Sequence, residues 1–344
     1  METRKKNAVR MNVAFDHVET NFSLKQAKLE NGFYNIIDGA RVSAGQTLSV
    51  INPATGQHLA AVPDVDRALL KKAINDARNA FSGWGAVPFK RRKAILASLL
   101  NKIDHYANEL SALLSAEQDV PLAQARWEID LLTKGFGPAL MQMELHEEGQ
   151  AAQHIEHITR HYVPIDAGGF MSRWNLPVIL SFGKVLPALL AGGTVLLRPS
   201  LFTPLTVLRI SEYVHALLPR GVFNVVTGGQ DLWPWMISHW GIDLITFTRS
   251  ANIGEPLFES AAGTLEPVAL ELAGNDSTAV ARTDPENIAR FGSIMQVPVN
   301  CQPGRYGLAS TLFEILSFSP VRMRTQVLVW SLARKASYTF PIFR

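Results

Sequence analysis

The spacing of apolar residues predicts two kinds of element in the first part of the chain. After a polar stretch at residues 1–30, segments 33–41 and 48–56 alternate apolar and polar positions and end in turn residues, which predicts short strands and hairpins. Apolar residues then recur at spacings of three and four, which is typical of amphipathic helices. The predicted helices cover residues 69–81, 91–109 and 123–145.

Beyond residue 165, short apolar runs alternate with helical stretches. The runs cover residues 168–171, 194–197, 221–226 and 244–247, and the helices cover residues 181–191, 205–218 and 231–239. Continuous apolar strands joined through helices indicate a parallel sheet covered on both faces, which binds ligands at the carboxyl ends of its strands. The expected fold class is therefore α/β, with a doubly wound parallel sheet of the Rossmann-like, nucleotide-binding kind.

One apolar stretch, residues 178–197, is long enough to imitate a membrane span. It carries Lys184, Pro187 and the pair Gly192 and Gly193, which favours a buried helix followed by a buried strand. No membrane partner is expected.

The charge distribution bears on nucleic acid as a partner. The formal net charge is +3 and the isoelectric point is about 9.0. From Gln302 onward there are six basic residues and one acidic residue, Glu314, which gives a net charge of +5. Residues 1–301 therefore carry a net charge of −2. Because no basic stripe interleaved with aromatic residues crosses the body of the chain, no nucleic-acid partner is expected.

The chain has a single cysteine, Cys301, so it cannot form an internal disulfide. The amino terminus lacks the apolar core of a secretory signal. These two features favour a reducing compartment, and the expected localisation is cytoplasmic.

A series of motifs in a fixed order carries a resemblance to a known family. Residues 173–178 read Arg-Trp-Asn-Leu-Pro-Val, residues 270–276 read Leu-Glu-Leu-Ala-Gly-Asn-Asp, and Asn300 and Cys301 follow. They resemble the P-W-N-F-P, L-E-L-G-G-N-D and nucleophile segments of NAD(P)-dependent aldehyde dehydrogenases. On these motifs the chain is identified as a C-terminally shortened or degenerate member of that family.

The resemblance implies three catalytic residues. Cys301 matches the nucleophile, Glu271 the general base and Asn175 the oxyanion amide. Such a site oxidises an aldehyde to the carboxylic acid through a thiohemiacetal and a thioester on the cysteine. A fixed side-chain N–H directed at the developing oxyanion contributes on the order of 3 kcal/mol.

The resemblance also implies a set of residues that contact NAD, with NADP left open. The set comprises Trp174, Arg198, Ser200, Gly228, Gly229, Thr248, Ser250, Gly254 and Leu272. NADP stays open because Leu201 stands where some relatives place a glutamate on the ribose, and Arg198 nearby could accept a 2′-phosphate. Arg249 replaces a glycine of the family's F-T-G-S segment, where a guanidinium either pairs with phosphate or obstructs the backbone.

Three histidines at three and four spacing, His154, His157 and His161, raise the alternative of a metal site. The same segment matches the family's connecting strands, in which alternate residues point to opposite faces. The strand interpretation is favoured, and no metal is expected.

The expected domain organisation follows the resemblance, which ends at Cys301. Residues 1–32 form an N-terminal arm, residues 33–270 the NAD(P)-binding domain with a connecting strand segment near 150–165, and residues 271–344 an incomplete α/β catalytic domain with a non-family tail after 301. Relatives are homo-oligomers, but the strand that joins their subunits has no counterpart here. The alternative function is a catalytically impaired relative that binds nucleotide or associates with full-length relatives.

Overall fold

The structure is a computed structural model that describes residues 29–144, 149–152, 155–159, 162–249, 268–272 and 333–335. Its largest sheet has the strand order β12-β11-β8-β9-β10-β1-β2. The five strands at one side are parallel: β8 (Ala167–Met171), β9 (Thr194–Arg198), β10 (Phe223–Val225), β11 (Leu244–Arg249) and β12 (Val268–Leu272). At the other edge, β1 (Asn35–Ile37) and β2 (Ala40–Val42) run antiparallel.

The order of the strands changes direction between β8 and β11. From β8 the chain passes to its neighbour β9 and then to β10, after which it crosses back to place β11 on the other side of β8. Met171 at the end of β8 is in register with Phe247 of β11. This reversal is the topological switch point of a doubly wound sheet, and it confirms the predicted fold class.

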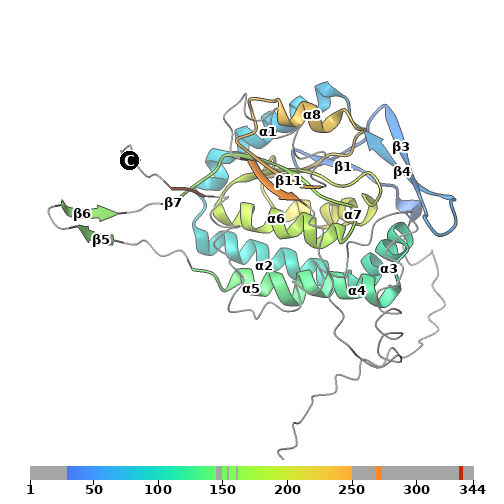
Figure 1. The fold of residues 1–344 in the computed structure, drawn as a ribbon, viewed down its shortest axis with the longest axis horizontal. Helices are drawn as coiled ribbons and strands as arrows, with labels where there is room; N and C mark the ends of the chain where they lie inside the picture. The colour runs from blue at the N-terminus through green and yellow to red at the C-terminus, as the bar shows by residue number, and fades with distance from the viewer. Residues whose placement is uncertain are drawn as a thin grey trace, which may run out of the picture.

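Helices cover both faces of the sheet (Figure 1). On one face lie α1 (Arg67–Gly85) and α8 (Leu232–Ile237), which contact each other. On the other face lie α6 (Pro177–Ala191) and α7 (Leu205–Val214). One hydrophobic core fills each interface, with Ile74 and Met236 in the first and Phe182 and Val207 in the second.

A further layer of helices packs against α6 and α7 (Figure 1). It consists of α2 (Phe89–His105), α3 (Ala107–Gln118), α4 (Leu122–Asp130), the π-helical turn η3 (Leu131–Phe136) and α5 (Gly137–Met141). The remaining elements are η2 (Leu29–Asn31), η4 (His215–Leu217), the hairpin β3 (Gln46–Ile51) with β4 (His58–Asp64), the hairpin β5 (Gly149–Ala152) with β6 (Ile155–Thr159), and β7 (Tyr162–Pro164) paired with β13 (Ala333–Lys335).

The apolar stretch 178–197 is a buried helix followed by a buried strand, as predicted. Helix α6 ends at Gly192, whose φ of 103° is readily adopted only by glycine. A Cβ on Gly193 would lie 2.6 Å from the carbonyl oxygen of Ile165, so both glycines are needed for the tight turn into β9. In the part of the chain that the structure describes, no helix has the length and apolarity to cross a bilayer.

Two helices predicted as continuous are divided. The first breaks at Tyr106, whose ring stacks on Tyr213 of α7 with 4.0 Å between centroids. The second loosens into η3 just before Pro138. Proline has no N–H with which to continue the hydrogen-bond ladder, and a π-helical turn accommodates the lost bond.

The strand interpretation of the histidine segment is confirmed where the structure describes it. His157 lies on β6, in the region near 150–165 where connecting strands were expected, and β5 and β7 flank it. His154 and His161 lie outside the described residues.

Candidate active site at the topological switch

The crevice at the carboxyl ends of β8 and β11 is where a doubly wound sheet binds its ligand. Ser172 to Leu176 follow β8 directly, and Thr248 and Arg249 end β11. Thr248 is in register with Glu271 of β12. The backbone therefore brings the Asn175 segment, the end of β11 and the end of β12 with Glu271 to the side of the sheet where the parallel strands have their carboxyl ends.

Asn175 lies in the turn between β8 and α6. It is 9% exposed, and among the residues that the structure describes its buried Oδ1 has no hydrogen-bond partner; the same holds for Ser172 Oγ. The next residue, Leu176, has a φ of 53°, a left-handed conformation that is costly for a bulky side chain. Buried polar atoms without partners in a native fold need an explanation.

The carbonyl of Trp174 is held from two sides. Gln118 Nε2, at the end of α3, and Thr203 Oγ1, in the loop after β9, each donate a hydrogen bond of 3.2 Å to this oxygen. Trp174 was predicted to contact the cofactor, and its side chain is half-buried. These bonds tie the turn after β8 to the loop after β9.

Two buried glutamates cap the helices that follow these turns. Glu128 Oε1 accepts hydrogen bonds from the amides of Val178 (2.7 Å) and Ile179 (3.1 Å) in the first turn of α6. Glu117 accepts hydrogen bonds of 2.7 and 2.8 Å from the first two amides of α7. Burial raises the pKa of Glu117 to about 7 and that of Glu128 to about 8.

Sequence analysis missed both glutamates because an acidic residue in an amphipathic helix resembles a solvent-exposed position. A signal was nevertheless present. Leu176 and Pro204 precede α6 and α7, and neither can cap a helix with its side chain, so another residue has to satisfy the first amides.

Arg198, predicted to contact the cofactor, holds a turn of its own chain. It is 8% exposed, and its Nη2 donates hydrogen bonds of 3.0 Å to the carbonyls of Gly228 and Gly229. The amide of Gly229 donates to Asp64 Oδ1 (2.9 Å), and a Cβ on Gly228 would lie 2.8 Å from Leu232 Cδ2. Gly228 thus allows close approach of the Leu232 side chain.

For the other predicted site residues, the structure gives side-chain contacts for some, only a strand position for others, and nothing for the rest. Ser200 is buried, and its Oγ accepts a hydrogen bond of 3.3 Å from the amide of Phe202. Thr248, Glu271 and Leu272 are placed by their strands alone. Ser250, Gly254 and Cys301 lie outside the described residues.

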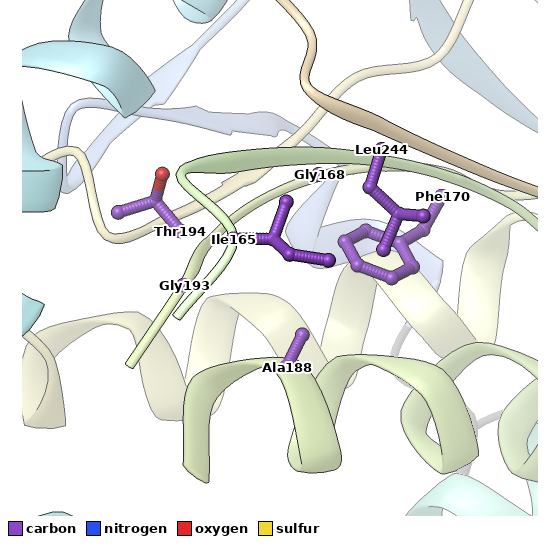
Figure 2. A pocket seen from close by; sticks show the side chains of 7 residues that line it. All are labelled: Ile165, Gly168, Phe170, Ala188, Gly193, Thr194 and Leu244. Carbon is purple, nitrogen blue, oxygen red and sulfur yellow. The ribbon is translucent and has the colours of Figure 1, made fainter. Parts of the chain in front are cut away.

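A small cavity lies between the sheet and α6 (Figure 2). Its volume is about 10 Å³, and its lining includes Gly168, Thr194 and Leu244 from the first residues of β8, β9 and β11, with Phe170 of β8 and Ala188 of α6. A space of this size holds at most one water molecule, so the cavity is not a substrate site. Within the described ranges, no three His, Cys, Asp or Glu side chains group as metal ligands.

Comparison with known proteins decides the family. The sequence profile described as "Aldehyde dehydrogenase family" matches residues 41–291, well over half of the chain. The chain belongs to the aldehyde dehydrogenase family. The profile begins within the predicted range of resemblance and ends before Cys301, so the position of the nucleophile stays a prediction.

Individual aldehyde dehydrogenases agree with this result. The 3,6-anhydro-alpha-L-galactose dehydrogenase of Streptomyces coelicolor is 34% identical over 241 residues, covering 67% of this chain and 48% of its own. An aldehyde dehydrogenase from Brucella melitensis biovar abortus has a similar structure, with a TM-score of 0.66 and 30% identity over 70% of this chain and 51% of its own. Aldehyde dehydrogenase C of Pseudomonas syringae, solved with NAD+ and octanal, gives a TM-score of 0.70 with 27% identity over 77% of this chain and 55% of its own. The chain spans about half the length of the curated relatives it matches.

Proposed function

We propose that the chain oxidises an aldehyde to the carboxylic acid, with NAD or NADP as hydride acceptor. The observation that carries the proposal is the position of Asn175. Its buried amide, whose Oδ1 has no partner within the described ranges, follows β8 at the switch point of the sheet, where a doubly wound fold binds its ligand. Family membership supplies the reaction class.

In this proposal Cys301 is the nucleophile. Its thiolate attacks the aldehyde carbon, which forms a thiohemiacetal and places negative charge on the former carbonyl oxygen. The N–H of the Asn175 side chain and the backbone N–H of Cys301 stabilise this oxyanion. Asn175 suits the role because no contact within the described residues engages its side chain in a hydrogen bond.

Glu271 completes the proposed reaction. Loss of hydride from the thiohemiacetal leaves a thioester on Cys301, and Glu271 removes a proton from the water that hydrolyses it. The carboxylic acid leaves and the thiol is restored. Glu271 is paired with Thr248, so its backbone lies near the carboxyl ends of the parallel strands, as the Asn175 turn does.

The crevice has features that fit a dinucleotide. Ser172 Oγ and Asn175 Oδ1, shortly after β8, are buried polar atoms that have no partner in the described part of the chain. Bound NAD(P) would supply the hydride acceptor. Trp174, Ser200, Thr248, Ser250, Gly254 and Leu272 are the residues proposed to hold it. Arg198, Gly228 and Gly229 are proposed to act by shaping the adjoining turn, because their groups already bond within the chain.

The test is aldehyde-dependent reduction of NAD and of NADP by the purified chain, across aliphatic and aromatic aldehydes. Cys301→Ser is the control, since a serine hydroxyl is a far weaker nucleophile at neutral pH. Turnover that the substitution abolishes supports the proposal. Full turnover in Cys301→Ser would overturn it.

A second candidate is a relative that binds nucleotide, or associates with full-length relatives, without turnover. Two observations favour it: the family profile ends before Cys301, and Arg249 ends β11 where the family motif has glycine. Titration with NADH, followed by its fluorescence, separates nucleotide binding from catalysis. Binding without turnover supports this candidate, and absence of binding counts against both.

A further inference from the structure

Side chains from α3 and α4 reach across to the turn that carries Asn175. Both helices belong to the layer that packs against α6 and α7, below them in Figure 1. Glu128 and Gln118, which are 1% and 4% exposed, contact the backbone on either side of Asn175. These contacts make the position of Asn175 depend on a helix pair that lies outside the crevice.

On the C-terminal side of Asn175, the start of α6 depends on Glu128. The residue at the N-cap, Leu176, is apolar and makes no side-chain cap, and Pro177 has no N–H. The amides of Val178 and Ile179 are therefore the first of the helix that need acceptors, and Glu128 Oε1 serves both. A single oxygen from α4 performs the capping that the local sequence lacks.

On the N-terminal side, the carbonyl of Trp174 depends on Gln118. Its Nε2 donates one of the two side-chain hydrogen bonds that this oxygen accepts, the other coming from Thr203. Asn175 thus lies between two anchored segments, next to Leu176 in its left-handed conformation. Anchors are what maintain such a conformation against its intrinsic cost.

We propose that Glu128 and Gln118 are positioning residues for Asn175, holding the backbone on both sides of it so that its amide is fixed at the switch point. The inference rests on the proposed role of Asn175 in aldehyde oxidation. Neither residue touches substrate or cofactor in this account. They act through the geometry of residues 174–176.

The test compares local with global effects of substitution. Glu128→Ala removes the acceptor, whereas Glu128→Gln keeps an amide oxygen at the position of Oε1. Gln118→Leu removes the bond to the Trp174 carbonyl. Val185→Ala serves as the matched control, because it removes buried volume from the later part of α6 without touching its first turn.

Amide hydrogen exchange of a peptide spanning residues 172–180 is measured in each variant. Gln118→Leu, which removes one buried hydrogen bond, is expected to raise its exchange rate roughly tenfold. Glu128→Ala, which removes the acceptor of two, is expected to raise it at least as much. Glu128→Gln and Val185→Ala are expected to leave the segment protected. The inference is overturned if the peptide stays protected in Glu128→Ala and Gln118→Leu, or if Val185→Ala exposes it equally.

A kinetic comparison adds the functional consequence. Glu128→Ala and Gln118→Leu are expected to lower kcat on the order of 10- to 100-fold, because misplacement of one catalytic group is costly. Glu128→Gln is expected to restore kcat. A loss of the same size in Val185→Ala would contradict positioning. If the unmodified chain has no turnover, the proposed function fails, and the exchange comparison still decides whether these residues hold the turn. Should Glu128→Ala not fold, Gln118→Leu and Glu128→Gln decide it.

Discussion

Glu128 Oε1 lies 2.7 Å from the amide nitrogen of Val178, three residues after Asn175 in the chain. The bond crosses from α4 to the first turn of α6 and is fully buried. Glu117 makes the equivalent contacts to α7. Two carboxyl groups therefore stabilise the starts of both helices that border the crevice.

This arrangement predicts that the chain becomes less stable as the pH rises from about 4.5 to about 8. The folded-state pKa values of Glu117 and Glu128 are raised to about 7 and about 8, mainly by burial, above the usual value of 4.5. The folded state thus binds more protons than the unfolded state in this window, so the free energy of unfolding falls with pH.

The pH prediction is checked by urea unfolding across this range with Glu128→Gln beside the unmodified chain. The variant is expected to lose less stability between pH 5 and pH 9, because its side chain does not ionise. The difference should be at most a few kcal/mol, since one pKa unit corresponds to about 1.4 kcal/mol. Parallel pH profiles for the two proteins would contradict the assignment of the raised pKa to Glu128.

Arg198 is predicted to be a stabilising residue. Arg198→Ala leaves the carbonyls of Gly228 and Gly229 without their donor and should lower the free energy of unfolding by about 1–3 kcal/mol. Arg220→Ala is the control, because its salt bridge with Asp38 is exposed and worth less than about 1 kcal/mol. Urea unfolding measures both. Equal losses in the two variants would show that Arg198 does not hold the turn.

Gly168 is predicted to tolerate no side chain. A Cβ there would lie 2.4 Å from Cε2 of Phe170, a ring that is 1% exposed, and the cavity of about 10 Å³ beside them cannot receive a displaced ring (Figure 2). Gly168→Ala should destabilise by about 1–3 kcal/mol, the typical cost of overpacking.

A matched substitution in α6 checks the Gly168 prediction. Nothing lies within 4 Å of a Cβ on Gly183, so Gly183→Ala should stabilise the chain by about 1 kcal/mol through helix propensity. Thermal unfolding of both variants gives the comparison. A midpoint that rises in Gly168→Ala would contradict the packing described for β8.

The fold could be predicted from sequence to the extent that it follows from local pattern. Apolar runs such as residues 194–197, bounded by glycine pairs and helical segments, identified the parallel strands and the nucleotide-binding class. The pattern could not show that β1 and β2 extend the same sheet, because the local sequence of a hairpin does not indicate which distant strand it pairs with. The register of Ile36 with Val225 is set by tertiary packing.

The candidate site was predictable only in part, for a related reason. Asn175 was identified through a motif, and the structure places it at the switch point. The partners of Arg198 and the capping by Glu128 depend on groups that are 30 and 50 residues away in the chain. Motifs record which residue stands at a position, whereas these contacts depend on how the helices and turns pack.

The most direct test of this account is the kcat of Asn175→Ala, measured at saturating aldehyde and NAD or NADP beside the unmodified chain. The account predicts a loss of about 10²- to 10³-fold, the typical effect of removing one oxyanion donor. Stability should be nearly unchanged, since Oδ1 has no partner to lose among the described residues. An unchanged kcat in a folded Asn175→Ala variant would contradict the assignment of this amide to catalysis.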